Sequence, residues 1–475
     1  MATNMNILLV NPPANVIEKP DFGELWGTVQ HTFTSDNILV HAINHGLLSI
    51  GSYLKKHGHN VTILDLSYDP NNVDNASNAF ARLKICLNNV KFDIVGISSQ
   101  SGYDYLESLE CATIVKQVQP KCTTIIGGQH AGFLGKTPLQ ENNSIDVLIK
   151  GEGEAVFMAI CAGEELKTIP GIVYRDKGRI CVNDGIMKPV DLTELRLDYT
   201  LYPNFSDFAP IVEESRGCPF DCHFCTNRQI YPAGIRYKPA EQIYEELLTV
   251  LELWGEKAYS QIIIFSAAQF GHNIENTLKL VELITPLNIT WTAEFRVDSK
   301  LSDYLDVLYA SGLRLIALGL ESADESILKL MNKTTNPKIY LKKCDELIGK
   351  ASKYIDLVIR LNIMFYVGES TSTILNTLNF LIEHKNYIDA IYVQPIYFNP
   401  GTKIMECEDD YSSRFGTKLY TNDYWKKRHL FFCDPSSKFK FQELIVFSSI
   451  LEKLFSSEYG WSVTEDMHYL HKEKK

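Results

Sequence analysis

The chain has 475 residues, of which 45% are hydrophobic and 22% are charged, and its formal net charge is −12. A chain of this length is too long to fold around a single hydrophobic core, which predicts two or three globular domains. The acidic balance and the lack of a long Lys/Arg run argue against a nucleic-acid partner. No signal peptide is recognisable, and no apolar run approaches the roughly 18 residues of a membrane span. We therefore expect a cytoplasmic protein without a membrane span.

Short β-branched strands alternate with helical stretches over residues 5–150. The segments NILLVNPP, NVTILDLS, FDIVGISSQSG, TTIIGGQH and IDVLIKGEGE predict a parallel sheet with helices on both faces. Such sheets bind ligands at the carboxyl ends of their strands. Small residues there let a large flat ligand approach the backbone, although any one glycine also fits an ordinary turn. The residues at these ends are Asn11, Ser98, Ser99, Gly127, Gly128, Gly151 and Gly153.

A second alternation of strands and helices follows a connector with a candidate β-hairpin, GIVYRDKGRICVNDG. Six strand–helix units predict an open, partial (β/α)6 barrel, with active residues at the carboxyl ends of its strands. The candidate strands span 210–215, 261–267, 289–295, 315–321, 356–367 and 389–398. We therefore expect an α/β protein with a Rossmann-like parallel-sheet domain at 1–160, a connector at 161–205, the barrel at 206–404 and a small, mainly helical region at 405–475.

Three cysteines lie in SRGCPFDCHFCTNR, directly after the first barrel strand, with the spacing C-x3-C-x2-C. Thiolates this close converge on one metal centre, and three of them leave one position open. A structural zinc site is normally closed by a fourth Cys or His. An iron–sulfur cluster with three protein ligands keeps one iron free for substrate. The pattern favours such a cluster on Cys218, Cys222 and Cys225, with zinc as the alternative.

This motif, with the aromatic Phe224 before its last cysteine, resembles the signature of radical S-adenosylmethionine (SAM) enzymes. The resemblance implies a 4Fe–4S cluster whose free iron binds SAM. The segments WTAEFRVD, LGLESADESILKLMNK, FYVGES and NPGTKI resemble further parts of that barrel. The stretch IIIFSAAQFGHN departs from the family, because it lacks the acidic residues that usually receive the SAM amino group. The implied SAM contacts are Phe224, Ser266, Gln269, Arg296, Glu321 and Ser322.

The N-terminal half resembles the cobalamin-binding domain of cobalamin-dependent radical SAM enzymes, through NPP, GLLSIGSYLKKHGHNVTILD, DIVGISSQSG, IIGGQHAG and IKGEGE in this order. The D-x-H-x-x-G motif of histidine-ligated cobalamin proteins is absent. His130 is a candidate cobalt ligand, although its loop more often borders the cofactor in this group. The implied cobalamin-binding residues are Asn11, Ser98, Ser99, Gly127, Gly128, His130, Gly151, Glu152 and Gly153.

Together the two resemblances imply a cobalamin-dependent radical SAM methyltransferase. Its expected reaction methylates an unactivated carbon, or a phosphorus, of a small metabolite or peptide, through methylcobalamin and a 5′-deoxyadenosyl radical. The cofactors would meet between the two domains. An external electron donor of the flavodoxin or ferredoxin type is the implied partner. The acidic charge makes a polynucleotide substrate a poor fit.

Other functions share part of this pattern. The altered SAAQ stretch also fits a cobalamin-dependent cyclase or rearrangement enzyme, or a methyl transfer that makes no radical. The tRNA methylthiotransferases join an α/β domain to a radical SAM barrel, but they carry N-terminal cluster cysteines and a basic C-terminal module. Here the first cysteine is Cys86 and the C-terminal part is not basic. A further alternative is a cobalamin or redox sensor, which would account for the N-terminal half but not for the barrel.

Overall fold

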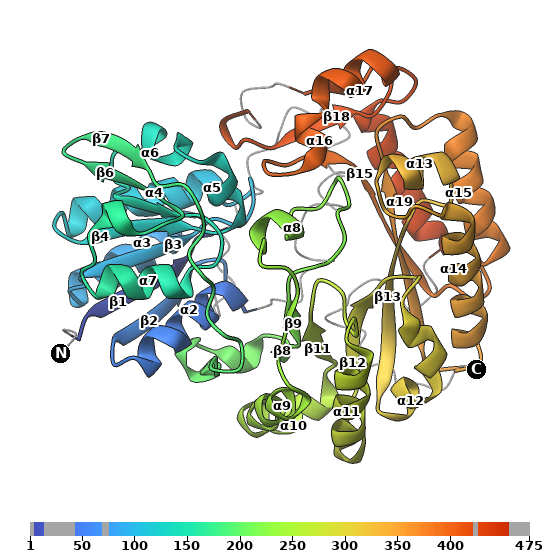
Figure 1. The fold of residues 1–475 in the computed structure, drawn as a ribbon, viewed down its shortest axis with the longest axis horizontal. Helices are drawn as coiled ribbons and strands as arrows, with labels where there is room; N and C mark the ends of the chain where they lie inside the picture. The colour runs from blue at the N-terminus through green and yellow to red at the C-terminus, as the bar shows by residue number, and fades with distance from the viewer. Residues whose placement is uncertain (1–3, 14–42, 69–75, 421–425, 456–475) are drawn as a thin grey trace.

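The computed structural model describes residues 4–13, 43–68, 76–420 and 426–455. Two α/β parts stand side by side in Figure 1, with the N-terminal sheet on the left and an open strand barrel on the right. A smaller C-terminal part lies above the barrel in this view. The predicted α/β class, with a parallel-sheet domain before a partial barrel, is confirmed.

Seven strands form the N-terminal sheet in the order β2-β1-β3-β4-β5-β6-β7, and the first five run parallel. The hairpin of the connector supplies β6 and β7, which extend this sheet in antiparallel direction. Neighbouring side chains of β1 point to opposite faces, Leu9 toward α2 and α7 and Leu8 toward α3 and α4. The strands are β1 (Asn6–Asn11), β2 (Asn60–Asp65), β3 (Ile94–Ser98), β4 (Thr123–Gly127), β5 (Val147–Ile149), β6 (Ile172–Asp176) and β7 (Arg179–Val182). The helices are α2 (His45–Lys56), α3 (Ala76–Asn89), α4 (Tyr105–Val118), α5 (Gln129–Leu134), α6 (Thr137–Glu141) and α7 (Glu154–Cys161).

Six parallel strands form the barrel sheet in the order β15-β14-β13-β12-β11-β8, so sequence neighbours are also neighbours in space. All six strands expected from the sequence are present. Along β14, buried residues alternate with partly exposed ones, because only one face packs into the hydrophobic core under the helices. The strands are β8 (Ile211–Glu213), β11 (Ile263–Ser266), β12 (Trp291–Phe295), β13 (Leu313–Glu321), β14 (Val358–Phe365) and β15 (Ala390–Pro395).

Helices cover the outside of the barrel. In the first of them, Ile243, Leu247, Val250 and Trp254 recur every three or four residues and are all buried, so this helix packs one apolar face on the sheet. The helices are α9 (Ala240–Trp254), α10 (Glu256–Ser260), α11 (Ile274–Ile284), α12 (Leu305–Ala310), α13 (Glu325–Leu330), α14 (Pro337–Ala351) and α15 (Thr371–Glu383). Between β8 and α9 lie β9 (Ser215–Arg216), α8 (Asn227–Ile230) and β10 (Arg236–Tyr237).

The C-terminal part is helical, as expected, but it also contains a small antiparallel sheet that the sequence did not indicate. A buried ion pair of 2.7 Å between Arg428 and Glu107 joins this part to α4 of the N-terminal sheet domain. Its elements are β16 (Tyr397–Phe398), α16 (Lys403–Glu406), α17 (Glu408–Phe415), β17 (Lys418–Leu419), β18 (Phe431–Asp434) and α19 (Phe441–Phe455).

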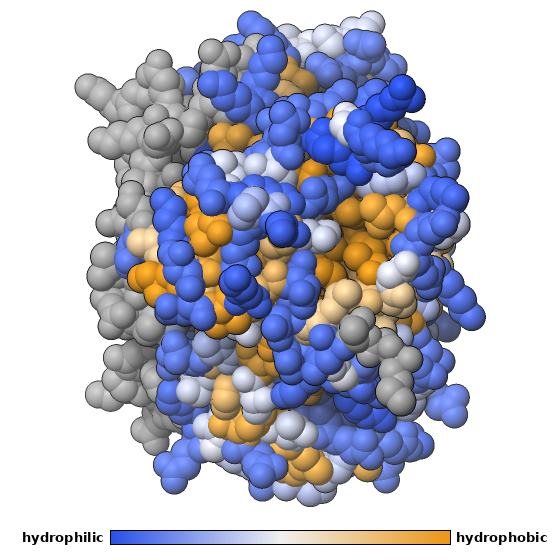
Figure 2. Space-filling model, turned by 90° about the vertical axis from the view of Figure 1, so that its left-hand side faces the viewer, coloured by the Kyte–Doolittle hydropathy of each residue, from blue (hydrophilic) through white to orange (hydrophobic). Residues whose placement is uncertain are grey.

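The outer face of the N-terminal part is largely hydrophilic and carries separate hydrophobic patches (Figure 2). Polar residues on this face are expected, because the helices turn their apolar sides inward onto the sheet. Within the ranges given above, no helix is both long and apolar enough to cross a membrane.

Candidate functional site

The cysteine loop leaves the carboxyl end of β8 and is closed at its base by the ladder between β9 and β10. Gly217 has a φ of +90°, and a Cβ there would meet the Gly234 carbonyl oxygen at 2.4 Å, so this turn requires glycine. The His223 amide donates to the Met331 carbonyl at 2.9 Å, and the Ile404 amide donates to the His223 carbonyl at 3.0 Å. These backbone contacts fix the loop against the barrel and the C-terminal part.

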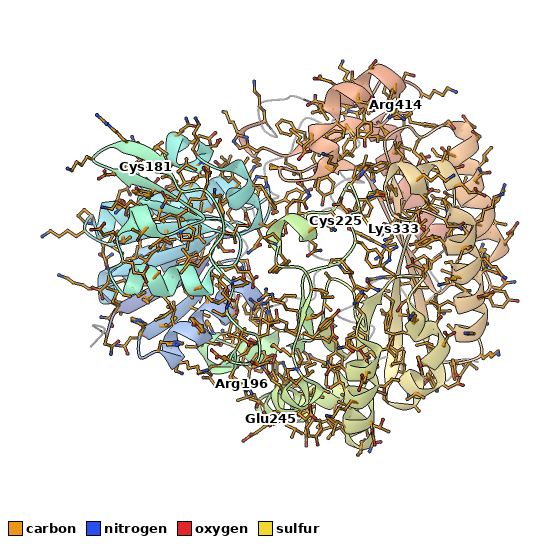
Figure 3. All side chains as sticks on the ribbon, viewed as in Figure 1. Cys181, Arg196, Cys225, Glu245, Lys333 and Arg414 are labelled. Carbon is orange, nitrogen blue, oxygen red and sulfur yellow. The ribbon has the colours of Figure 1, made fainter. Side chains whose placement is uncertain are left out.

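The three thiols of the loop are all half-buried. Arg296 Nη1 lies 3.9 Å from Cys222 Sγ, and Asn227 Nδ2 donates to Cys225 Sγ at 3.4 Å. Burial raises the pKa of Cys222, while the Lys333 and Arg296 cations act in the opposite direction. Figure 3 shows Cys225 in the middle of the molecule, between the two α/β parts, with Lys333 on its barrel side.

These thiols suit a cluster better than a single ion. Within the described part of the chain, no three His, Cys, Asp or Glu side chains surround one ion position. A cubane cluster needs no such arrangement, because each thiolate binds a different iron. N–H groups of Arg296 and Asn227 point at two of the three sulfurs, and such donors tune and stabilise sulfur-ligated clusters.

Arg296 follows β12 and is locked in place beside the thiols. Its guanidinium bonds the Asp298 carboxylate at 2.8 Å and the Lys333 carbonyl at 2.7 Å, and it stacks 3.7 Å from the ring centre of Phe220. The side chain is buried. A fixed cation at this strand end therefore lies beside the thiols of the cysteine loop. Phe224 lies on the same loop and faces Tyr366 edge-on, with ring centres 6.4 Å apart.

Glu321 ends β13 in the left-handed region, with a φ of +68°, which is costly for a residue other than glycine. Lys333 Nζ bonds its carboxylate at 2.8 Å, and the pair is buried. This strain at a strand end is typical of a functional position. The neighbouring Ser322 is engaged within the protein, since its hydroxyl accepts from the Asp324 amide at 3.1 Å and lies 3.3 Å from Thr377 Oγ1.

The SAAQ stretch follows β11 and forms one wall of the cavity between the two parts. Ser266 lines that wall together with the two alanines after it. Gln269 does not line the cavity, and its buried Oε1 has no hydrogen-bond partner within the described residues. The Ser266 carbonyl accepts from the Glu214 amide at 2.9 Å, so the backbone of Glu214 pairs with the start of this stretch. Sequence analysis missed Glu214, because an acid before a cysteine motif carries no distinctive signal.

Glu214 is fully buried, and neither carboxylate oxygen has a hydrogen-bond partner in the described ranges. Burial raises the pKa of Glu214 to about 7, and the neighbouring Ser215 hydroxyl opposes this rise. The Glu214 carboxyl group therefore takes up a proton more readily than an exposed carboxyl group, in contrast to the neighbouring Glu213. The Arg216 guanidinium, His45 and Lys238 hold the pKa of Glu213 well below its usual range, despite burial.

A cavity of about 740 Å³ lies between the N-terminal sheet and the barrel. Its N-terminal wall includes small residues at the carboxyl ends of the strands together with larger apolar side chains such as Ile50, Ile149 and Phe157. Its barrel wall includes the start of the cysteine loop, residues of α8 and the first three residues of the SAAQ stretch. Gly128 shows why the residues must be small, because its φ is +101° and a Cβ would lie 2.5 Å from the Ser99 carbonyl oxygen. Of the residues predicted to bind cobalamin, those that line the cavity are Ser98, Gly127, Gly128, Gly151, Glu152 and Gly153.

The other three residues predicted to bind cobalamin do not line the cavity. The side-chain amide of Asn11 donates through Nδ2 to Asp65 Oδ1 and to Ser67 Oγ, both at 3.0 Å. The Ser99 backbone bonds the start of α5, where its carbonyl accepts from the His130 amide at 3.1 Å. Asn11 and Ser99 therefore bond neighbouring segments at the carboxyl edge of the sheet and do not face the cavity.

His130 turns away from the cavity because α5 rotates by about 100° per residue. Residues at helical spacing, Gln129, Gly132 and Phe133, face the cavity, and His130 lies on the other side. Its Nε2 bonds the Arg428 carbonyl at 2.8 Å, and burial lowers its pKa to about 4. In this structure His130 therefore contacts the C-terminal part and does not line the cavity.

A buried network of charges holds the two walls together. Arg216, from the cysteine loop, bonds Glu154 at 2.7 Å, Glu152 at 3.0 Å and Glu213 at 2.7 Å. Gln129 Nε2 also donates across the interface, to Thr226 Oγ1 at 2.6 Å. Of these four charged residues the sequence had indicated only Glu152, as a cobalamin-binding residue, because the pairing of Arg216 with Glu152 and Glu154 joins segments more than 60 residues apart.

Two family models match the chain in the positions that the geometry indicates. The B12 binding domain matches residues 36–161, and the radical SAM superfamily matches residues 212–381. The first covers most of the sheet side of the cavity, and the second covers the cysteine loop and the barrel as far as α15.

The chain is also similar to individual known proteins. The chain is 26% identical over 381 residues to an uncharacterized methyltransferase of Pyrococcus horikoshii, covering 77% of this chain and 78% of that protein. It is 24% identical to the anaerobic magnesium-protoporphyrin IX monomethyl ester cyclase of a Synechocystis species, covering 61% of this chain and 58% of the cyclase. Its fold is shared by the solved structure of the radical SAM methyltransferase TsrM from Kitasatospora setae, which has cobalamin and a 4Fe–4S cluster bound. The TM-score is 0.68 and the sequence identity is 13%, over 89% of this chain and 78% of that chain.

Proposed function

Because this chain is a radical SAM protein with an N-terminal B12-binding domain, we propose that it is a cobalamin-dependent radical SAM methyltransferase. Its cofactors are a 4Fe–4S cluster, SAM and cobalamin. We propose an unactivated carbon or a phosphorus of a small molecule or peptide as the methyl acceptor. One observation carries the proposal: a single cavity has one wall from the B12-binding domain and the other from the barrel, directly beside the cysteine loop.

The residues present fit these groups. Cys218, Cys222 and Cys225 would hold the cluster, and the glycine-rich strand ends would accept the corrin of cobalamin. When bound, the cluster supplies electrons to SAM and cobalamin carries a methyl group. Arg296 offsets the negative charge of the thiolates, and the buried Arg216 network keeps the two walls at a fixed separation.

We propose an external electron donor of the flavodoxin or ferredoxin type, since reduction of the cluster needs electrons that the chain does not supply. We keep the proposed domain limits of 1–160, 161–205, 206–404 and 405–475, with the hairpin β6–β7 as the part of the connector that pairs with the N-terminal sheet.

The test uses the full chain, reconstituted anaerobically with its cluster, loaded with hydroxocobalamin and reduced with titanium(III) citrate. SAM is added, and S-adenosylhomocysteine and 5′-deoxyadenosine are measured by mass spectrometry. We expect both products, because methyl donation and radical formation each consume SAM. The Cys225→Ser variant is the control and should form no 5′-deoxyadenosine. Failure of the wild-type chain to form either product with an intact cluster would overturn the proposal.

A second candidate is a cyclase, a rearrangement enzyme or a polar methyl transfer with the same cofactors. The observation that favours it is the SAAQ stretch, which forms part of the cavity wall without an acidic side chain. The same experiment separates the candidates. Formation of 5′-deoxyadenosine without S-adenosylhomocysteine would indicate cyclisation or rearrangement. Formation of S-adenosylhomocysteine alone would indicate polar transfer.

A further inference from the structure

The inner face of the barrel sheet is partly accessible, whereas its outer face is packed under the helices. Along β14, the residues that alternate with the buried apolar ones face the barrel interior, and they are partly exposed. These inward-facing residues include Arg360, Asn362 and Met364. On β12 the inward-facing Glu294 is exposed, although its two sequence neighbours are buried. A barrel core filled by side chains would bury such positions, so solvent reaches the interior of this barrel.

Arg360 carries a guanidinium in this interior that the described residues leave without a partner. It forms no hydrogen bond and no ion pair with them, and its Nε is buried in this state. The two terminal nitrogens also lack a partner, but they are not sealed from water. By contrast, Arg314 on β13 bonds Asp356 at 3.1 Å and lies over the ring of Tyr309. A partly buried cation costs free energy unless an anion satisfies it, so the position of Arg360 suits an anionic ligand.

The surroundings of Arg360 leave room for a bound group. The strand register places four residues of β12, β13, β14 and β15 in one row, namely Glu294, Ala317, Arg360 and Ala390. Adjacent strands lie about 4.8 Å apart, so roughly 10 Å separates the Cα atoms of Glu294 and Arg360. Ala317 between them and Ala390 on the other side are small. The guanidinium is therefore flanked by space on both sides of its strand.

Tyr392 supplies a second unused donor to the same place. It faces the interior from β15, where it is paired with Asn362, the next inward-facing residue after Arg360. Its hydroxyl has no hydrogen-bond partner within the described ranges. Burial lowers the pKa of Arg360, and Glu294 and Tyr392 oppose this effect, so both side chains lie close enough to act on the guanidinium.

These donors favour a carboxylate over a phosphate. A guanidinium binds the two oxygens of a carboxylate with two parallel hydrogen bonds, and a hydroxyl can donate a third. Glu294 in the same row repels a doubly charged phosphate more strongly than a singly charged carboxylate. Met364, four residues further along β14, packs in the same cluster as Phe224 of the cysteine loop. Four strand residues span about 13 Å, so a group held at Arg360 is far from that loop.

We propose that the substrate is an elongated carboxylic acid, whose carboxylate binds Arg360 and Tyr392 inside the barrel. Its methyl acceptor would then lie on the order of 10 Å away, toward the cysteine loop. This inference rests on the proposed function, because it narrows the class of methyl acceptor. It assigns the specificity for the acid to β14 and β15, where the sequence had indicated no binding residue.

Protection of Arg360 from phenylglyoxal, which modifies accessible guanidinium groups, tests the proposal without SAM or cobalamin. The full chain, reconstituted with its cluster, is treated with and without hexanoate, and modification of each arginine is followed by mass spectrometry. Arg360 should react in the free chain, and hexanoate at about ten times its Kd should slow this reaction about tenfold. Inorganic phosphate at the same ionic strength should protect less. Arg314 is the internal control, and its rate should not change with hexanoate.

Calorimetric titration with hexanoate gives a second readout. Arg360→Gln should weaken binding by about 10- to 100-fold, because it removes charge-assisted hydrogen bonds, and Arg314→Gln should leave it unchanged. An unreactive Arg360 in the free chain, no protection by hexanoate, equal protection by phosphate or unchanged affinity in Arg360→Gln would each overturn the inference. The wild-type labelling decides the question even if the variant does not fold. A chain that binds hexanoate at Arg360 but forms neither S-adenosylhomocysteine nor 5′-deoxyadenosine from SAM would instead count against the proposed function.

Discussion

At the scale of single residues, the proposed cluster ligands differ from the other cysteines in their surroundings. Cys218, Cys222 and Cys225 are half-buried beside cations and N–H donors, whereas Cys344 and Cys433 are fully buried in apolar cores. Thiols of the first kind are available to iron and those of the second kind are inert. The cysteine loop therefore holds three accessible thiols in fixed positions.

We predict that Cys225→Ser abolishes cluster retention, because a hydroxyl is a much poorer iron ligand than a thiolate and two thiolates cannot hold a cubane cluster firmly. Iron content and absorbance of the reconstituted protein measure this loss. Cys86→Ser, at a half-buried cysteine of α3, is the matched control and should retain wild-type iron. Equal iron in both variants would contradict the assignment of Cys225.

A second prediction at this scale concerns Glu214, whose pKa is raised from 4.5 to about 7 by burial. The folded chain binds this proton more tightly than the unfolded chain, so the stabilisation is complete below about pH 4.5 and is lost as the pH rises to about 7. The loss amounts to roughly 3 kcal/mol, at about 1.4 kcal/mol per unit of pKa shift. Glu214→Gln removes the charge that must be buried at higher pH.

Thermal unfolding at about pH 4 and about pH 8 checks this prediction. The two chains should unfold at similar temperatures at the lower pH, and Glu214→Gln should be the more stable chain at the higher pH. Glu282→Gln, at an exposed position of α11, is the control and should follow the wild type throughout. Parallel curves for wild type and Glu214→Gln would show that the burial of this carboxyl group has no such cost.

At the scale of elements, the order of strands was predictable and the shape of the cavity was not. β1 is an uninterrupted apolar run before a Pro-Pro stop, and the cysteine spacing identified the loop after β8, so both are local signals. His130 was selected on the same local basis, but the rotation of α5 turns it away from the cavity. Arg216 gave no local signal, because it meets the cavity only through tertiary packing.

The turn between β4 and α5 yields a prediction at this scale. Gly128→Ala should destabilise the chain by about 1–3 kcal/mol, because alanine is strained at a φ of +101° and its Cβ would clash with the Ser99 backbone. Cobalamin retention should fall with it, since the turn forms part of the cavity wall. Urea unfolding and the cobalamin content after gel filtration measure the two effects.

Gly349→Ala is the control for this turn. Gly349 lies inside α14 with open space around its Cβ position, so alanine there should be neutral or stabilising by up to about 1 kcal/mol. A Gly128→Ala chain as stable as this control would mean that the β4–α5 turn relaxes without cost, and the strain argument for the glycine-rich wall would fail.

At the scale of the whole molecule, the N-terminal sheet is held from two directions. Arg216 joins it to the barrel beside the cavity, and Arg428 joins it to the C-terminal part through Glu107 and the carbonyls of Gly102 and Tyr103. The cavity therefore lies between two parts whose separation is set by buried ion pairs. Such pairs are specific because a lone buried charge is costly, even where the intact pair adds little net stability.

We accordingly predict that Arg428→Met destabilises the chain by about 3–5 kcal/mol, because it leaves Glu107 buried without its partner. Urea unfolding measures the loss. Arg414→Met, which breaks the exposed pair with Asp410, is the control and should cost about 0–1 kcal/mol. Arg428→Met should also weaken cobalamin retention, since it loosens the sheet from the C-terminal part while leaving every cavity residue in place. A large loss of stability with unchanged cobalamin content would show that the barrel contact through Arg216 alone sets the cavity.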